Sequence, residues 1–341
     1  MTVTIKDVAR QCGMSISTVS KVFNAYPDIS QETRNEVLRV ARDMGYQPNA
    51  LARALKTNRS YNLGVLFVDE NISGLTHPFF AAMLNAFKAR AEMLGYDITF
   101  INHNIGTMSM TYLEHCRYRN VDGVCLACVD FYSSEVAELM NSDIPTTTVD
   151  HMFEGRACVF SDNLAGMRML VDHAVSKGHR RIAYIHGQRN SVVTEKRIAA
   201  FRRSMAAHGL EVREDYILEG RYDDVAHTRR LTSQLLQLPE RPTCILLPDD
   251  ASWLGALEAA TALGFRVPDD VSFAGYDGIR LTQQLHPKLT TILQDAEAMG
   301  QEAALLLIDR IVNPGTEVGE PTLVPVRLIE GETLGPVPVE A

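Results

Sequence analysis

The chain has 341 residues, of which 46% are hydrophobic and 22% are charged. This length indicates about two domains, and this composition excludes a disordered, collagenous or disulfide-stapled chain. No apolar run reaches the roughly 18 residues that a membrane span needs, and the N-terminus lacks the apolar region of a signal peptide. We therefore expect a cytoplasmic protein with no membrane partner.

The six cysteines are too sparse to form a disulfide framework. Cys125 and Cys128 have the CxxC spacing, but they lie in the apolar run 123–129, which predicts a strand. No second cysteine pair completes a zinc site. We interpret both residues as small core residues and expect no bound metal.

Charge is distributed unevenly along the chain. The formal net charge is -9, yet residues 1–60 contain nine Lys and Arg against five Asp and Glu, which gives a net charge of +4 and leaves -13 for the remainder. A small basic head on a large acidic body is typical of a protein that contacts a polyanion at one end only.

The first 46 residues predict three short helices. A capping-box pattern begins at Thr4, Gly13 ends the first helix, and Ser15 and Ser30 precede the second and third. Two short helices joined by a glycine-containing turn predict a helix-turn-helix. The alternative is a three-helix bundle without a ligand, but the polar, basic outer face of the second helix favours a head that reads the DNA major groove.

Residues 47–60 predict a linker that contains a helix of about two turns. Pro48 ends the third helix and Asn49 can cap the next one. A helix this short should become ordered only when something packs on it. On DNA, Leu55 could enter a base step of the minor groove while Arg53 and Lys56 contact phosphates.

Four stretches of this region carry a resemblance to a known family. They are Thr4-Ile-Lys-Asp-Val-Ala-Arg10, Ser15-x-Ser-Thr-Val-Ser-Lys-Val22, Glu32-Thr-Arg-Asn-Glu-Val37 and Tyr46-x-Pro-Asn-Ala-Leu-Ala-Arg53. The chain resembles the lactose/galactose (LacI/GalR) repressor family in its head and hinge. The resemblance implies that double-stranded operator DNA is bound by Thr4, Ser15, Ile16, Ser17, Thr18, Ser20, Lys21, Asn24, Asn49, Ala52, Arg53, Leu55 and Lys56.

Within that set, Ile16 and Ser17 occupy the two positions that the family varies to choose its operator. Ile16 can contact a thymine methyl group and Ser17 can pair with several bases, so the preferred sequence stays open. Lys21 is expected to read a base as well, while Thr18 and Ser20 hold phosphates.

From residue 62 onward, strands and helices alternate. The expected strands are 63–68, 97–101, 123–129, 145–149 and 182–186, and the expected helices are 78–94, about 109–118 and 133–140. This alternation predicts parallel sheets with helices on both faces. An internal echo between residues 86–98 and 200–212 indicates two similar α/β subdomains with a ligand cleft at the carboxyl ends of their strands.

The stretches Gly178-His-Arg-Arg-Ile-Ala-Tyr184, Lys196-Arg-Ile-Ala-Ala-Phe201, Pro268-x-Asp-Val-Ser-Phe-Ala-Gly-Tyr-Asp277 and Pro287-x-Leu-Thr-Thr-Ile292 extend the resemblance to that family's effector-binding core. It implies two doubly wound subdomains of the periplasmic-binding-protein type. Their expected bounds are 61–162 with 294–322, and 163–293 with 323–335. His179 is expected to join a helix to a strand and to have no catalytic role.

Loops after the predicted strands carry aromatic rings, carboxylates and an arginine, a combination typical of sugar sites because rings stack on a pyranose and charged groups bond its hydroxyls. By matching motif, Arg197, Asp249 and Asp277 should hold the ligand. The remaining expected effector-binding residues are His77, Phe79, Phe80, Met83, Asp150 and Phe160.

The sequence therefore predicts a homodimeric transcriptional repressor with no enzymatic cofactor, controlled by a sugar or sugar phosphate that changes the arrangement of the subdomains. The C-terminal tail has no leucine heptad, so a dimer is expected. One alternative is a global or purine-type regulator with a nucleotide or protein corepressor. A sugar-binding transport protein is disfavoured by the head, and an enzyme by the absence of GxSxG, GxGxxG, P-loop and HExxH motifs.

Overall fold

The computed structural model describes residues 3–24, 26–47, 59–68, 74–189 and 191–337. It consists of two compact units, Met1–Tyr61 and Asn62–Ala341. Within the described ranges, no helix is both long and apolar enough to cross a membrane. Five of the predicted DNA contacts lie outside the described residues: Asn49, Ala52, Arg53, Leu55 and Lys56.

The first unit contains the three predicted helices, α1 (Ile5–Cys12), α2 (Ile16–Phe23) and α3 (Gln31–Asp43). The cap predictions are confirmed. The Asp7 carboxylate accepts hydrogen bonds from the backbone N–H and the hydroxyl of Thr4, and Gly13 follows α1 in the left-handed conformation at φ 64°. The hydroxyl oxygens of Ser15 and Ser30 accept the backbone N–H groups of Thr18 and Thr33. These side chains therefore satisfy N–H groups at the starts of the helices.

Valines form most of the core of this unit. The fully buried residues come from all three helices, and Phe23 and Tyr46 close one side with ring centroids 5.2 Å apart. The buried set is Val8, Ala9, Val19, Val22, Val37, Val40 and Ala41. Because Val19 and Val22 face inward, Ile16 and Ser17 of α2 are left exposed, as the helical spacing predicts.

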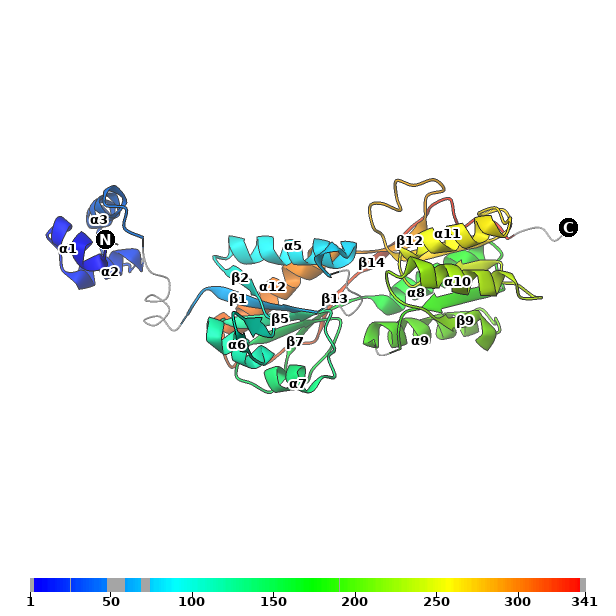
Figure 1. The fold of residues 1–341 in the computed structure, drawn as a ribbon, viewed down its shortest axis with the longest axis horizontal. Coiled ribbons are helices and arrows are strands. Elements are labelled where there is room, and N and C mark those ends of the chain that lie inside the picture. The colour runs from blue at the N-terminus through cyan, green and yellow to red at the C-terminus, as the bar shows by residue number, and fades with distance from the viewer. Residues whose placement is uncertain (1–2, 25, 48–58, 69–73, 190, 338–341) are drawn as a thin grey trace. The chain divides into compact units, whose positions relative to one another are not determined.

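The second unit contains two six-stranded sheets, which define an N-lobe and a C-lobe (Figure 1). The N-lobe sheet is parallel throughout. In spatial order its strands are β13 (Thr322–Val324), β7 (Ala157–Ser161), β6 (Thr146–Val149), β5 (Gly123–Ala127), β1 (Asn62–Phe67) and β2 (Asp97–Phe100).

Helices cover both faces of the N-lobe sheet. On one face lie α5 (Pro78–Met93) and α12 (Ala296–Val312), and on the other lie α6 (Tyr112–Arg119) and α7 (Ser134–Met140). A short hairpin, β3 (Asn104–Ile105) and β4 (Met108–Ser109), precedes α6. The helix predicted from about residue 109 therefore begins later, at Tyr112, because Thr111 and Glu114 form a capping box there.

The C-lobe repeats this plan with one strand reversed. In spatial order its strands are β14 (Val326–Ile329), β12 (Thr290–Gln294), β11 (Ser272–Asp277), β10 (Cys244–Leu246), β8 (Ile182–His186) and β9 (Ile217–Glu219). The pairing of β14 with β12 is antiparallel, and the other four pairings in this sheet are parallel. Two helix pairs cover its faces: α8 (Asn163–Ser176) with α9 (Val192–Ala207), and α10 (Val225–Leu236) with α11 (Ser252–Ala262).

The chain crosses between the lobes three times, after β7, after β12 and after β13. The carboxylates of Asp162 and Asp295 follow the first two crossing strands and cap the next helix by accepting the N–H groups of Ala165 and Ala298, each at 2.9 Å. The third crossing lies two residues later than the expected break between residues 322 and 323, because β13 extends to Val324 and pairs with β7.

One other prediction needs correction. The strand expected over 123–129 ends at Ala127, and Cys128 adopts φ 52°, so it is not a core strand residue. The internal echo is present in α5 and α9, each followed by a glycine with positive φ, Gly95 and Gly209. The next strand of the C-lobe begins at Ile217.

Candidate functional site

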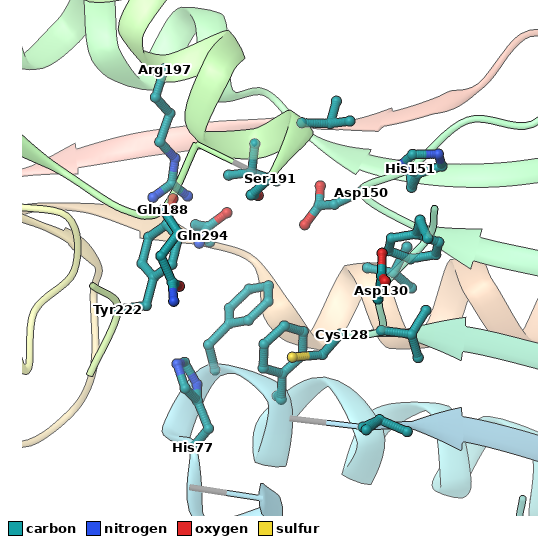
Figure 2. A pocket seen from close by; sticks show the side chains of 18 of the residues that line it. His77, Cys128, Asp130, Asp150, His151, Gln188, Ser191, Arg197, Tyr222 and Gln294 are labelled. Atoms are coloured by element: carbon teal, nitrogen blue, oxygen red, sulfur yellow. The ribbon is translucent and has the colours of Figure 1, made fainter. Parts of the chain in front are cut away.

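A cavity of about 210 Å³ lies between the lobes, at the carboxyl ends of their strands (Figure 2). It lies where parallel α/β sheets bind ligands. The lining residues are Val68, His77, Phe79, Phe80, Cys128, Val129, Asp130, Phe131, Tyr132, Val149, Asp150, His151, Gln188, Ser191, Val192, Val193, Arg197, Tyr222, Asp277 and Gln294.

Arg197 of α9 is fixed on the C-lobe side of the cavity. Its guanidinium lies 3.5 Å from the ring centroid of Tyr276, its Nε donates to Asn163 Oδ1 at 2.7 Å, and its Nη1 donates to Pro248 O at 3.2 Å. Burial alone would lower the pKa of this group, but Tyr276, Tyr222 and Asp277 raise it above its ordinary value. Arg197 therefore stays charged and held in one orientation.

Asp277 ends β11 on the same side of the cavity. Its backbone has φ 108°, and its Oδ1 accepts the side-chain Nε2 of Gln294 at 2.6 Å. Burial raises the pKa of the Asp277 carboxyl to about 6, although the nearby Arg197 opposes that rise. Arg197, Asp277 and Gln294 therefore form a preorganised set of donors and acceptors, which we call the polar wall.

Tyr222, in the loop after β9, lies beside the polar wall. Its hydroxyl lies 2.8 Å from Thr194 Oγ1, and a Cβ at Gly187 would lie only 2.1 Å from the Tyr222 ring. Glycine at position 187 is therefore required for the close approach of this ring to the backbone.

The N-lobe side of the cavity is mainly aromatic. Phe80 of α5 contacts the rings of His77, Phe79 and Phe67. In the loop after β5, Phe131 stacks on His151 with 4.4 Å between centroids and 8° between ring planes. These rings, which we call the aromatic wall, present flat apolar surfaces toward the cavity.

Two carboxylates, those of Asp130 and Asp150, lie on the same side of the cavity as the aromatic wall. Asp150, directly after β6 with φ 60°, accepts the backbone N–H of Ser161 at 3.2 Å. Burial raises the pKa of its carboxyl to about 6. Lys196, the residue before Arg197, places its ammonium 3.6 Å from the ring centroid of Phe160. The positive charges of Arg197 and Lys196 oppose the rise in pKa, and the partly exposed Asp150 forms no direct salt bridge with a described residue.

Six of the nine predicted effector-binding residues line the cavity: His77, Phe79, Phe80, Asp150, Arg197 and Asp277. Met83, Phe160 and Asp249 do not. Met83 is fully buried where α5 meets α12, at a contact so close that a Cβ at Gly300 would lie 2.1 Å from Met83 O. The ring of Phe160 is covered by Lys196.

Asp249 is used inside the C-lobe. Its two carboxylate oxygens accept the backbone N–H groups of Ser252 and Asp223, each at 2.7 Å, and the residue is 2% exposed. This carboxylate therefore fixes the start of α11 to the loop that carries Tyr222. The sequence correctly indicates a strand-end carboxylate but cannot show that backbone groups occupy it.

Several lining residues are absent from the sequence-based prediction. The loop 128–132 was not expected because the preceding strand was predicted to run to Val129. Gln188 belongs to a loop that the sequence does indicate, between β8 and Arg197. Tyr222 follows β9 and Gln294 ends β12, and neither strand was predicted. The signal that could have identified them is the one that selected the other effector-binding residues, a polar or aromatic residue directly after an apolar strand.

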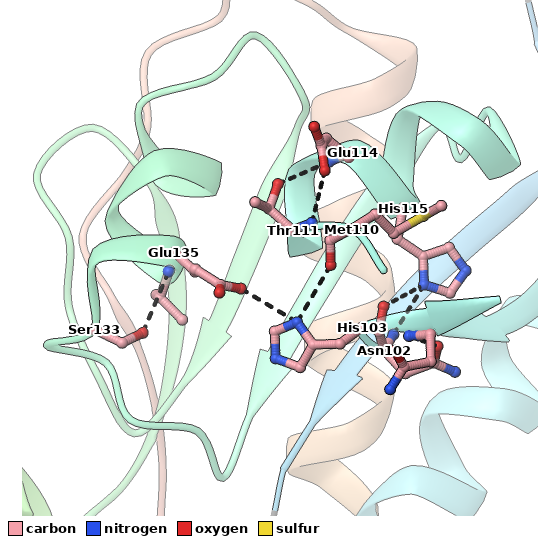
Figure 3. Close-up of polar contacts among 10 residues, drawn as sticks. Asn102, His103, Met110, Thr111, Glu114, His115, Ser133 and Glu135 are labelled. Atoms are coloured by element: carbon pink, nitrogen blue, oxygen red, sulfur yellow. Dashed lines mark hydrogen bonds and ion pairs between the residues drawn. The ribbon is translucent and has the colours of Figure 1, made fainter. Parts of the chain in front are cut away.

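A polar cluster around His103 and Glu135 lies in the N-lobe (Figure 3). His103 Nδ1 lies 3.4 Å from Glu135 Oε2 and 3.3 Å from Met110 O, and its ring packs on Tyr112 at 4.3 Å. Glu135 is in the first turn of α7, directly after the cavity-lining loop. The cluster therefore links that loop to the segment after β2.

The head presents a candidate nucleic-acid interface on α2. Ile16 is 47% exposed, and the hydroxyl oxygens of Ser15 and Ser17 lie 2.7 Å apart. Lys21 Nζ donates to Asp28 Oδ2 at 2.5 Å, and Asn24 Nδ2 donates to Ser20 O at 2.7 Å. The outer face of α2 therefore combines the exposed Ile16 with polar groups, and its one basic residue, Lys21, is paired with Asp28.

Two predicted DNA contacts also have local roles. Thr18 Oγ1 lies 2.8 Å from Ser15 Oγ, and the Thr4 hydroxyl donates to Asp7 at the start of α1. His179, as expected, is structural: it is fully buried, with Nδ1 2.9 Å from Thr243 Oγ1 and Nε2 3.0 Å from Gly335 O. Among the described residues, no cluster of His, Cys, Asp or Glu is arranged to hold a metal ion.

A helix-turn-helix unit and a two-lobed unit with a polar and aromatic cavity define a ligand-responsive DNA-binding regulator. Two family models agree: bacterial regulatory proteins of the lacI family match residues 4–49, and the periplasmic binding protein-like domain matches residues 171–334.

Among curated proteins, the transcriptional repressor PurR of Vibrio parahaemolyticus is 33% identical over 90% of this chain and 92% of its own length. PurR of Escherichia coli is 32% identical over 98% of both chains. Two solved structures are also similar. The lac repressor dimer bound to operator and the anti-inducer ONPF is 26% identical with a TM-score of 0.83, covering 98% of this chain and 100% of that chain. The regulator CelR in complex with cellobiose is 27% identical with a TM-score of 0.70, covering 97% and 99%.

The chain belongs to the LacI family of bacterial regulatory proteins. It is a DNA-binding transcriptional repressor with an effector-binding domain, and it is not an enzyme.

Proposed function

We propose that this repressor acts in the cytoplasm as a homodimer whose operator affinity is set by a sugar bound between the lobes. The observation that carries the proposal is the polar wall: Arg197, Asp277 and Gln294 are held at fixed positions opposite a wall of aromatic rings. Vicinal hydroxyls suit the polar wall, and the apolar face of a pyranose suits the rings.

Charge favours an unphosphorylated sugar over a sugar phosphate. Three carboxylates line the cavity, from Asp130, Asp150 and Asp277, and Arg197 is the one Lys or Arg among the described lining residues. A phosphate would add negative charge to a buried site that is already acidic, which costs free energy unless cations compensate it.

A purine is the second candidate effector, and the observation that favours it is the identity of 32–33% with two PurR repressors. Stacked rings such as Phe131 and His151 could also hold a flat nucleobase. The two candidates differ in what the polar wall must satisfy, because a sugar offers a row of hydroxyl groups and a purine offers a planar edge.

In the proposed mechanism, the α2 helices of two heads bind two operator half-sites, with Ile16, Ser17 and Lys21 toward bases. Ligand in the cavity contacts both lobes and therefore favours one arrangement of them. If only one arrangement is compatible with operator binding, ligand and operator affinity are coupled without direct contact.

Operator binding can be tested even though the preferred base sequence is open. Duplexes selected from a random pool by the full-length protein should share a nearly palindromic motif, and affinity for that motif should fall steeply with salt. Recovery of no preferred duplex would contradict the proposed DNA-binding role.

Effector identity can be tested by thermal denaturation with a panel of neutral sugars, amino sugars, sugar phosphates, nucleobases and nucleosides. A ligand at about 100 times its dissociation constant should stabilise the protein by about 2.7 kcal/mol. We expect a neutral or cationic sugar to give the largest shift. A larger shift with a purine base would contradict the sugar proposal and support the second candidate.

A further inference from the structure

The charged groups around the cavity are distributed unequally. Figure 2 shows Arg197, Tyr222 and Gln294 toward one end of the cavity and Asp130, Asp150 and His151 toward the other. The carboxylate of Asp277 has a neighbouring cation in Arg197. The end that contains Asp130 and Asp150 has no Lys or Arg among its described lining residues.

The Asp150 carboxylate forms no salt bridge with a described residue, although the positive charges of Arg197 and Lys196 oppose the rise in its pKa. Ser161 N–H is the only hydrogen-bond donor to it among the described residues, and that bond is long at 3.2 Å. Lys196 is directed at the Phe160 ring, where its ammonium lies 3.6 Å from the centroid. Burial, followed by the effect of Lys196, lowers the pKa of His151.

A carboxylate that is partly removed from water is stabilised by hydrogen bonds and by a paired positive charge. Here the acid is retained at a cavity wall formed by Phe131, Tyr132 and His151. A carboxylate beside aromatic rings provides both interactions that an ammonium group prefers, an ion pair and contact with the π faces. A neutral hydroxyl could also donate a hydrogen bond to Asp150 but would form no ion pair with it.

We infer that the effector carries a protonated amine that binds Asp150, and that the effector class is therefore an amino sugar or a similar aminated polyol. This inference rests on the proposed sugar-responsive function and makes it more specific. The hydroxyl groups of the ligand face Arg197, Asp277 and Gln294, while its ammonium group faces Asp150 and the aromatic wall.

The test compares ligands that differ only at the amine. Isothermal titration at pH 7 uses D-glucosamine, D-glucose and N-acetyl-D-glucosamine, and the corresponding D-galactosamine series. We expect the better amino sugar to bind about tenfold or more tightly than both of its neutral counterparts. Equal or weaker binding of the amine in both series overturns the inference.

Two variants test whether Asp150 is the residue that causes the preference for the amine. Asp150→Asn retains the shape of the side chain and removes its charge, so the amine preference should fall to within about twofold. Asp277→Asn is the matched control, and it should weaken all the sugars while leaving the ratio between amine and neutral sugar unchanged. A ratio that survives in Asp150→Asn overturns the assignment to Asp150.

Benzylamine and benzyl alcohol provide a pair of probes that does not depend on the sugar stereochemistry. If no member of either sugar series binds, stabilisation by benzylamine alone supports the ammonium site, and no difference between the two probes overturns it. If a neutral sugar binds best and changes operator affinity, the amine inference fails while the proposed function stands. If the full-length protein selects no duplex from the random pool, the proposed DNA-binding function fails, whatever the result of the amine comparison.

Discussion

The head and the cavity use polar side chains in opposite ways. On α2, Lys21 is 41% exposed at its side chain and bonded to Asp28, which is 53% exposed. In the cavity, Arg197 is 3% exposed and held by three groups at once. Solvent-exposed recognition residues can be replaced at small cost in stability, whereas buried ones contribute to the fold. A substitution in the head should therefore change DNA binding without changing stability, whereas a substitution in the cavity should change both ligand binding and stability.

The largest effect is expected for Arg197→Ala. The variant leaves Asp277 without its neighbouring cation and Tyr276 without the group packed on it, which should lower the free energy of unfolding by about 3 to 5 kcal/mol. Urea denaturation at pH 7 measures this loss. Adding Asp277→Asn to the variant should restore part of it. A loss below about 1 kcal/mol would show that the polar wall is not a coupled unit.

Asp150→Asn should stabilise the ligand-free protein in a pH-dependent way. Because the folded pKa of Asp150 is about 6 against an ordinary 3.8, its ionised form destabilises the fold above about pH 6, and this penalty disappears as pH falls toward 3.8. The variant should gain up to about 3 kcal/mol at pH 7.5 and little near pH 4.

Denaturant unfolding at the two pH values measures that gain. Asp143→Asn, at a side chain that is 90% exposed, is the matched surface control and should change stability by less than about 0.5 kcal/mol. A gain for Asp150→Asn that is independent of pH would contradict the assigned cause.

Lys21→Ala should affect operator binding and leave the fold intact. We expect a loss of about 1 to 3 kcal/mol in operator affinity and relaxed preference at one base pair, with stability changed by less than about 0.5 kcal/mol. Competition binding with operator variants measures both. Asp28→Asn is the control, since it releases Lys21 without removing it and should preserve the base preference. An unchanged operator preference in Lys21→Ala would remove this residue from the readout.

The smallest effect is expected for His103→Gln in the polar cluster of the N-lobe (Figure 3). His103 and Glu135 have side chains that are 44% and 39% exposed, so their pair should contribute less than about 1 kcal/mol to stability. Effector affinity should change by less than about threefold, because neither side chain lines the cavity. A tenfold loss of affinity by titration would instead show that this cluster positions the loop 128–132.

Local sequence patterns predicted much of this architecture. The caps at Thr4, Ser15 and Ser30 depend on residues three positions apart, so they could be identified directly. Strand ends could be located to within a few residues, which placed His77, Asp150 and Asp277 at the cavity.

Other features depend on contacts between distant segments. Whether a strand-end carboxylate faces the cavity or accepts backbone N–H groups separates Asp277 from Asp249, and both follow apolar strands. Similarly, Met83 is fully buried where α12 approaches α5 at Gly300, and it does not line the cavity. These outcomes are set by tertiary packing, which periodicity and local propensity do not encode.

The central claim is that occupancy of the cavity controls the operator affinity of the head. Its most direct test is the dissociation constant for the selected operator, measured by fluorescence anisotropy with and without a saturating amount of the tightest ligand from the sugar panel. We predict a change of about fivefold or more in the wild-type protein and no change in Arg197→Ala at the same ligand concentration. If the ligand stabilises the wild-type protein but leaves this constant unchanged, the account is contradicted.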